Sequence, residues 1–312
     1  MSKDDSNCSE KKGMDFYMNT YTVSSKHYVN AMSADNPAIM TVPSGSRLIF
    51  ETKDALDGQV QNENQGFDSM NWDRVNPATG PVAIEGAQSG DALKITIERI
   101  ECDSSGVMAA IGGFGALADE IETPGIKVLS ILKDRIPFID GVDLPLRPMI
   151  GVIGTAPAGE AVPCGVPGRH GGNLDCKLIE PGNNLYLPVF HPGALLAMGD
   201  VHACMGDGEV MGTGVETAAK VHVIVELVKN HLISDPILKT DDRIYSLASD
   251  ETLELASIRA IRNVRDMVME KLGLDKNTAG MLISAIGDLE ICQIVDPKLT
   301  VRFGIPSAIL RE

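Results

Sequence analysis

Glycine and proline are distributed unevenly along the chain, and this distribution constrains the fold more than any other feature. Most of the 31 glycines and 17 prolines precede residue 235, where they separate short segments rich in β-branched residues. This punctuation predicts strands joined by turns. The predicted strands are residues 47–52 (RLIFET), 92–100 (ALKITIERI), 186–190 (YLPVF) and 218–232 (AAKVHVIVELVKNHL). In the last of them, valines recur at every second position (Val221, Val223 and Val225), which is typical of a half-buried strand.

The last quarter of the chain changes to a helical pattern. In residues 253–272, apolar side chains recur at spacings of three and predict an amphipathic helix: Leu255, Ile258, Ile261, Val264 and Met267. Gly273 is the predicted C-cap. A second helix is predicted from an N-cap at Asn277 or Thr278 to about Glu290, followed by a strand over residues 299–303. The predicted fold is therefore a β-rich α+β fold, with layered, sandwich-like sheets, helices packed on one side and a C-terminal helical pair.

Length and charge restrict the domain organisation and the partners. The 312 residues suffice for one large domain, predicted over residues 14–312 after a polar, flexible leader at residues 1–13. The net charge of −16 argues against nucleic acid and anionic membranes as partners, because both require basic patches. The leader lacks the apolar core of a secretory signal, and the six cysteines are scattered without a C-x-x-C pair. These features predict reduced thiols and a cytoplasmic protein.

Residues 199–216 (GDVHACMGDGEVMGTGVE) combine four carboxylates and one histidine with no lysine or arginine. In an extended segment, residues two apart point to the same face, so Asp200 is predicted to pair with His202, and Asp207 with Glu209. Gly206 and Gly208 permit a turn between these pairs. Carboxylates that lie close together repel one another unless a cation lies among them. The stretch therefore predicts a site for a divalent metal ion.

The ligand types indicate which metal. A histidine mixed with carboxylates suits zinc or another first-row divalent ion, whereas carboxylates alone suit calcium or magnesium. We therefore predict zinc, with calcium as a second or structural ion. Upstream, residues 170–175 (HGGNLD) place Asn173 and Asp175 two apart behind a glycine turn. The two glycine-rich loops could converge at one end of a sheet and share a pocket.

Simpler interpretations of the same residues compete with a metal site. An Asp-x-His pair on a strand is commonly a surface or capping feature, and Gly-Asp-Gly is commonly a turn. Cys204 could be a nucleophile, but neighbours on a strand point to opposite faces, which places His202 poorly as its base. His222 is expected to be solvated or structural. Met198, Met205 and Met211 are expected to be packing residues.

Several ordered segments resemble the acetamidase/formamidase family. They are residues 199–216 together with FETKDALDGQV (50–60), NPATGPVAIEGAQSGDALKITI (76–97), GRHGGNLDCK (168–177), LPVFHPGALLAMGD (187–200) and the C-terminal residues 266–296. The resemblance extends from about residue 15 to the end of the chain. It departs from the family at Met205, where many members carry glutamine, and this difference could alter the substrate range.

The resemblance implies a metal-dependent amidase that converts formamide or acetamide to the carboxylate and ammonia. The expected metal ligands are His202, Asp175 and Asp200, with Asp54 of the matching KDAL piece as a further candidate. Glu209 is the expected base, and Asp207 would orient a ligand or share that role. Asn173 and the backbone N–H groups of Gly206 and Gly208 are candidates for binding the oxyanion.

Two alternatives keep the same scaffold. One is hydrolysis of a different or larger amide, and the other is a metal-stabilised binding protein without catalysis. The resemblance also implies a homo-oligomer, such as a dimer.

Overall fold

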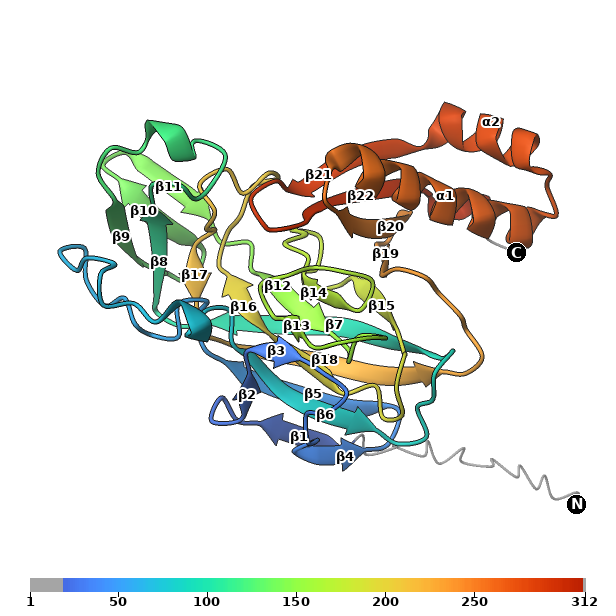
Figure 1. Ribbon diagram of the computed structural model, residues 1–312, viewed down its shortest axis with the longest axis horizontal. Coiled ribbons are helices and arrows are strands. Elements are labelled where there is room, and N and C mark those ends of the chain that lie inside the picture. The colour runs from blue at the N-terminus through green and yellow to red at the C-terminus, as the bar shows by residue number, and fades with distance from the viewer. Residues whose placement is uncertain (1–18, 311–312) are drawn as a thin grey trace, which may run out of the picture.

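Two nine-stranded β-sheets form most of the computed structural model, which describes residues 19–310 (Figure 1). The predicted leader, residues 1–13, lies outside the described residues. The first sheet contains, in spatial order, β1 (Thr20–Val23), β5 (Ser46–Thr52), β18 (Ala219–Val228), β7 (Ala92–Cys102), β15 (Asn184–Pro188), β19 (Ile237–Lys239), β20 (Arg243–Asp250), β22 (Leu299–Pro306) and β21 (Asp288–Gln293).

The second sheet carries the candidate site. Its order is β14 (Gly171–Asn173), β12 (Met149–Gly154), β16 (Leu196–His202), β17 (Glu216–Thr217), β8 (Ser105–Ala110) and β9 (Gly125–Ser130). In addition, β6 (Ala78–Ile84) pairs with β16, β2 (Tyr28–Val29) and β4 (Met40–Val42). Two small pairs complete the strands: β10 (Arg135–Ile139) with β11 (Val142–Pro145), and β13 (Val162–Pro163) with β3 (Ala31–Met32).

One hydrophobic core lies between the two sheets. Phe50, Ile95 and Val223 from the first sheet belong to the same buried group as Ile150 and Met198 from the second. Each of these side chains has an exposed fraction of 0%. The prediction of layered sheets is therefore confirmed, and the two sheets form a packed scaffold around the strands that bear the site.

The predicted strands are present, with small differences at their ends. In β18 the side chains of Val221, Val223 and Val225 are fully buried, whereas Lys220 on the opposite face is exposed. The strand pairs antiparallel with both β5 and β7. It ends at Val228, before the predicted residue 232, because the backbone turns at Asn230 with φ of 52°.

The C-terminal helical pair packs on one part of the first sheet. Helix α1 (Leu253–Leu272) and helix α2 (Lys276–Ile286) share a second hydrophobic core with side chains of β20 and β22 (Figure 1). Thr252 caps the start of α1 by accepting a hydrogen bond from the Leu255 N–H at 3.2 Å. Gly273 ends the helix with φ of 66°, as predicted.

The predicted amphipathic helix is present, but the apolar face predicted for α1 is only partly the buried one: Val264 is buried and Ile261 packs against the same core. The buried side chains are Ala256, Ala260, Val264 and Val268, at a spacing of four residues. Leu255 and Ile258, which belong to the predicted apolar face, have exposed fractions of 49% and 37%. The small alanines allow the helix backbone to approach the sheet closely, so the i, i+4 row faces β20 and β22 instead of the larger residues.

The predicted boundaries of the second helix are also wrong. Asp275 caps its start, because one carboxylate oxygen accepts from the N–H groups of Asn277 at 2.9 Å and Thr278 at 3.1 Å. The helix ends at Ile286, and residues beyond Gly287 form strand β21, which pairs with β22. A side chain at Gly287 would collide with Phe303, so the chain makes its turn at this glycine.

Within residues 19–310, neither helix has the length and apolar composition needed to cross a membrane. All five cysteines in this range are free thiols.

Adding bulk to the buried face of α1 should destabilise the fold. We expect Ala260→Leu to lower the free energy of unfolding by about 1–3 kcal/mol, because the extra carbon atoms must displace packed side chains of β20 and β22. Arg262→Leu adds a leucine to the exposed face of the same helix and should change the stability by less than about 0.5 kcal/mol. Urea denaturation of both variants measures the difference, and equal effects would contradict this packing.

Candidate metal centre

Four carboxylates converge on one nitrogen of His202, the last residue of β16. The distances to Nε2 of His202 are 3.2 Å from Asp200 Oδ1, 3.2 Å from Glu216 Oε2, 3.8 Å from Asp175 Oδ1 and 4.0 Å from Glu209 Oε1. We call these five residues the His202 cluster. All five side chains are nearly inaccessible to solvent, with exposed fractions of 1–4%.

The strand order of the second sheet explains why these residues meet. Strand β12 lies between β14 and β16, so Asp175, just beyond β14, and Asp200 in β16 approach each other across Gly151. A Cβ atom at Gly151 would lie against Asp175 Oδ1 and 2.8 Å from Asp200 Oδ2. Only glycine therefore leaves room for both carboxylates. Glu216 lies in β17, which pairs with the end of β16.

Three residues of the His202 cluster adopt a left-handed backbone. The φ angles are 40° at Asp175, 51° at Asp200 and 47° at Glu209. This region is unfavourable for residues other than glycine, and such strain is concentrated at functional sites. The backbone is therefore held in an unfavourable conformation at the positions that aim carboxylates at His202.

Burial dominates the pKa shifts of three carboxyl groups in the cluster, whereas neighbouring charges dominate the pKa shift of His202. Burial raises the pKa of Asp175 and Glu209 well above their usual range, and it raises the pKa of Glu216 to about 8. For His202, burial lowers the pKa, but the charges of Glu216 and Asp200 outweigh it and raise the pKa well above its usual value. His202 is the only basic side chain that faces the four carboxylates at these distances among the described residues.

The residues of the cluster fit a divalent cation. Both carboxylate oxygens of Asp175 and Oε2 of Glu216 are buried without a hydrogen-bond partner among the described residues. Two sets of side chains bring their ligand atoms within 4.8 Å of one another: Asp175, Asp200 and His202, and His202, Glu209 and Glu216. Buried carboxylates that lack hydrogen bonds are costly unless paired or bound to metal, so a cation would satisfy oxygens that the protein leaves unpaired.

The other ring nitrogen of His202 faces a methionine. Nδ1 lies 3.3 Å from the Sδ atom of Met205, the residue at the position where the resembling family commonly has glutamine. A thioether is only a weak hydrogen-bond acceptor. Met205 therefore contacts the ring of the central histidine and is not only a packing residue.

A cavity of about 500 Å³ opens onto the cluster. Its polar lining includes Asn173, Asp200, His202, Glu209, Glu216 and Asp296. Its apolar wall includes Leu56, Trp72, Val75, Ile111, Phe114 and Val166. The cavity thus places a buried acidic group beside an apolar surface, as ligand sites commonly do.

The structure does not bring every predicted residue into this site. Asp207 points away from Glu209, because both of its carboxylate oxygens accept from Arg302 at 2.8 Å and one also contacts Lys177 at 2.7 Å. The predicted common face fails because residues 203–209 form bends and turns and not an extended strand. Asp54 closes a local turn by accepting from the N–H groups of Leu56 at 2.9 Å and Gly58 at 3.0 Å.

The predicted oxyanion donors do not present free N–H groups to the cluster either. The Gly208 N–H donates to the Cys292 carbonyl at 2.8 Å, and Gly206 is exposed outside the cavity lining. Asn173 does line the cavity, but its Nδ2 donates to Asp296 Oδ2 at 2.9 Å. These groups are therefore engaged elsewhere or lie away from the cluster.

Two residues that were not predicted join the site. Glu216 lies in the same acidic stretch, so its charge was a usable signal, although nothing local indicated its orientation. Asp296 follows β21 near the C-terminus, and burial, then the charge of Asp175, raises its pKa well above the usual range. No sequence pattern links Asp296 to His202, because the fold alone brings them together.

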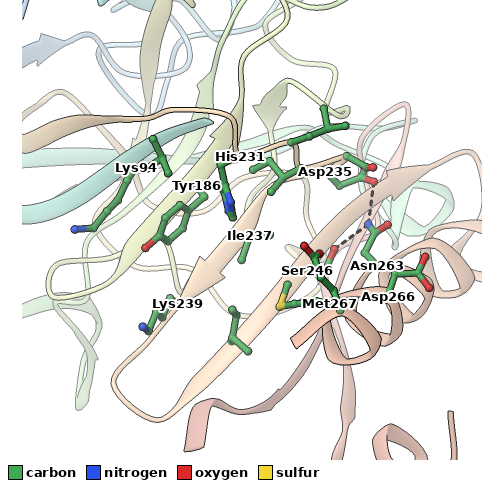
Figure 2. A pocket seen from close by; sticks show the side chains of 16 residues that line it. Lys94, Tyr186, His231, Asp235, Ile237, Lys239, Ser246, Asn263, Asp266 and Met267 are labelled. Carbon is green, nitrogen blue, oxygen red and sulfur yellow. Dashed lines mark hydrogen bonds between the residues drawn. The ribbon is translucent and has the colours of Figure 1, made fainter. Parts of the chain in front are cut away.

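A second cavity, of about 540 Å³, lies between β15, β19, β20 and α1 (Figure 2). Three of its polar side chains bond to one another: Asn263 Nδ2 donates to Asp235 Oδ2 at 2.9 Å and to Ser246 Oγ at 3.0 Å. Among residues 19–310, neither candidate metal group lies there. Of these two cavities, only the first therefore contains a candidate metal group among the described residues.

Comparisons with known proteins point to one family. The sequence model of the Acetamidase/Formamidase family matches residues 18–163 and 158–312. The solved structure of an acetamidase from Bacillus halodurans is 45% identical, with a TM-score of 0.91, and the match covers 92% of this chain and 98% of that one. A predicted acetamidase/formamidase from Thermoanaerobacter tengcongensis is 42% identical, with a TM-score of 0.92 and coverage of 94% and 97%.

A curated acetamidase from Mycolicibacterium smegmatis is 27% identical over an alignment of 271 positions, and the match covers 64% of this chain. The chain spans 66% of the length of that relative.

Filling the space at Gly151 should disrupt the metal centre. In Gly151→Ala the new methyl group would push Asp175 and Asp200 apart, and we expect the affinity for a divalent cation to fall at least about tenfold. Gly206→Ala is the control, because no atom lies within 4 Å of a Cβ there. Metal content after dialysis against a buffered metal concentration measures the change, and unaltered binding by Gly151→Ala would contradict the proposed ligand geometry.

Proposed function

The chain belongs to the acetamidase/formamidase family, and we propose that it is an amidase that hydrolyses short aliphatic amides, such as formamide and acetamide, to the carboxylate and ammonia. The observation that carries this proposal is the convergence of four buried carboxylates on His202 Nε2 beside a cavity. The acetamidase from Bacillus halodurans, 45% identical, supports the same class of reaction.

The proposed cofactor is a divalent cation, with zinc preferred because histidine and carboxylates form the ligand set. Calcium remains the alternative as a second or structural ion. His202, Asp175 and Asp200 would hold the ion, and Glu216 replaces Asp54 as the further ligand because its unpaired Oε2 faces His202. When bound, such a cation lowers the pKa of water and polarises a carbonyl group.

Glu209 is the proposed general base. Its carboxylate lines the cavity and has the longest of the four distances to His202 Nε2, at 4.0 Å, so it is the least committed to the ligand set. From this place it can accept a proton from the water that attacks the amide carbon. It can then return the proton to the nitrogen that leaves as ammonia. Asp207 is withdrawn from this role because Arg302 and Lys177 hold its carboxylate.

The size of the cavity favours a second candidate within the same reaction class. About 500 Å³ and an apolar wall that includes Trp72 and Phe114 exceed what acetamide can fill. Hydrolysis of a larger amide with an apolar acyl group is therefore the alternative to formamide and acetamide.

The remaining proposals concern the organisation of the protein. We propose one domain over residues 14–312, a homo-oligomer, and a cytoplasmic location. Free thiols among the described cysteines are compatible with the last point.

Metal analysis combined with an ammonia assay tests the proposed function. We expect about one or more divalent ions per chain and ammonia release from formamide or acetamide. Chelation should abolish both, because it removes the cation that activates water. Chelation should also lower the melting temperature, since an ion bound at 1,000 times its Kd contributes about 4 kcal/mol to stability. Ammonia release that survives complete removal of metal would contradict the proposal.

Replacing the base should separate catalysis from metal binding. We expect Glu209→Gln to lower kcat about 10²- to 10⁴-fold, because the amide side chain cannot take up the proton, while the metal content stays unchanged. Asp207→Asn is the matched variant, since it removes the other candidate carboxylate, and it should keep most of the turnover. A fully active Glu209→Gln would contradict the assignment.

A further inference from the structure

The two ring nitrogens of His202 lie in different surroundings. The four carboxylates of the cluster converge on Nε2, whereas Nδ1 lies 3.3 Å from the sulfur atom of Met205. Among the described residues, this sulfur is the hydrogen-bond partner of Nδ1, and no other is present. Met205 is partly exposed and lies in the loop that follows β16, outside the set of carboxylates and histidine that would bind a cation.

Backbone hydrogen bonds hold this loop in place beside the ring. Val215 accepts from the Ala203 N–H at 2.8 Å and donates to the Cys204 carbonyl at 2.9 Å. These two residues are the ones that separate His202 from Met205 in the chain. The contact between the sulfur and the imidazole is therefore fixed by the backbone on which both side chains are carried.

The sulfur determines which nitrogen of a neutral imidazole carries the proton. A thioether has no hydrogen to donate and only accepts. Its contact with Nδ1 is therefore a hydrogen bond when the proton is on Nδ1. In that tautomer Nε2 is unprotonated, which is the form of histidine that binds a metal ion. The thioether thus favours the tautomer that presents a free nitrogen to the four carboxylates.

The same sulfur is a weak acceptor for this position. Metal-binding histidines almost always donate their other N–H to a carboxylate, a backbone carbonyl or water, and this partner makes the ligand more basic. A thioether provides much less of this effect. The neighbouring segment cannot supply a stronger acceptor from a side chain at Gly214, because a Cβ atom there would lie 2.7 Å from Nδ1. The basicity of Nε2 therefore depends on Met205.

We propose that Met205 is a positioning residue that sets the metal affinity of His202. Its sulfur accepts the hydrogen bond from Nδ1, holds the ring in the tautomer that offers Nε2 to the cation, and limits how tightly the ion binds. This inference rests on the cation proposed for the His202 cluster. It goes beyond that proposal because it assigns control of the affinity to a residue outside the ligand set, for which the sequence predicted only a packing role.

Two substitutions separate hydrogen bonding from packing. Met205→Leu keeps the apolar bulk and has no acceptor, whereas Met205→Gln has a similar length and supplies an amide oxygen, which is a stronger acceptor than sulfur. A residue that only packed would tolerate leucine better than glutamine. Because Met205 accepts a hydrogen bond, we expect Met205→Leu to weaken the affinity for Zn²⁺ about tenfold and Met205→Gln to strengthen it about tenfold.

Competition with a chromophoric chelator measures the zinc dissociation constant of each metal-free protein. His202→Ala reports zinc that is held elsewhere on the chain, such as on thiols. Met211→Leu is the matched control, because Met211 lies in the same stretch, is also partly exposed and makes no hydrogen bond to His202 among the described residues. It should leave the affinity unchanged. The order glutamine, methionine, leucine from tightest to weakest supports the inference, and any other order at position 205 overturns it.

Far-UV circular dichroism shows whether each metal-free variant is folded. If Met205→Leu does not fold, the comparison of Met205→Gln with the wild type decides alone: tighter zinc binding supports the inference, and equal or weaker binding overturns it. The affinities are measured without substrate, so their order in a protein that releases no ammonia would refute only the proposed amidase function. Wild-type protein that binds no zinc would refute the proposed cofactor, and the inference with it.

Discussion

Repulsion among buried carboxylates is the interaction on which the arrangement of this protein depends. Four carboxylates lie within 4.0 Å of His202 Nε2, and all are nearly inaccessible to solvent. Without a cation, burial and mutual repulsion raise the pKa of Asp175, Glu209 and Glu216, which means that the charged state is unfavourable. A divalent ion bound among them would reverse this balance, and the fold and the metal would then stabilise each other.

The scaffold must hold the cluster against both repulsion and backbone strain. Each left-handed residue, Asp175, Asp200 and Glu209, costs about 1–3 kcal/mol. The packed core between the two sheets supplies the opposing free energy, because β12 and β16 are buried along their whole lengths. Close packing also requires glycine beside the site. A Cβ at Gly214 would lie 2.7 Å from His202 Nδ1, just as one at Gly151 would displace the acids.

The parts that could be predicted from sequence are those governed by local periodicity. The alternation in β18, the cap of α1 at Gly273 and the pairing of Asp200 with His202 all follow from neighbours in the chain. Tertiary packing decided the rest. The alanine face of α1 was not evident, because larger apolar residues gave a competing pattern at a spacing of three. Asp296 had no local signal, since only the return of the chain through β21 brings it to the cavity.

The C-terminal strands β21 and β22 therefore contribute to the site. Arg302 in β22 is buried with an exposed fraction of 1%, and it holds Asp207 as well as Glu290. The Gly208 N–H donates to the Cys292 carbonyl in β21, and this hydrogen bond fastens the loop that carries Glu209 to β21. Asp207, predicted as a catalytic partner, therefore acts as an anchor. The packing of α1 and α2 on this part of the first sheet fixes β21 and β22, and through them the positions of Glu209 and Asp296.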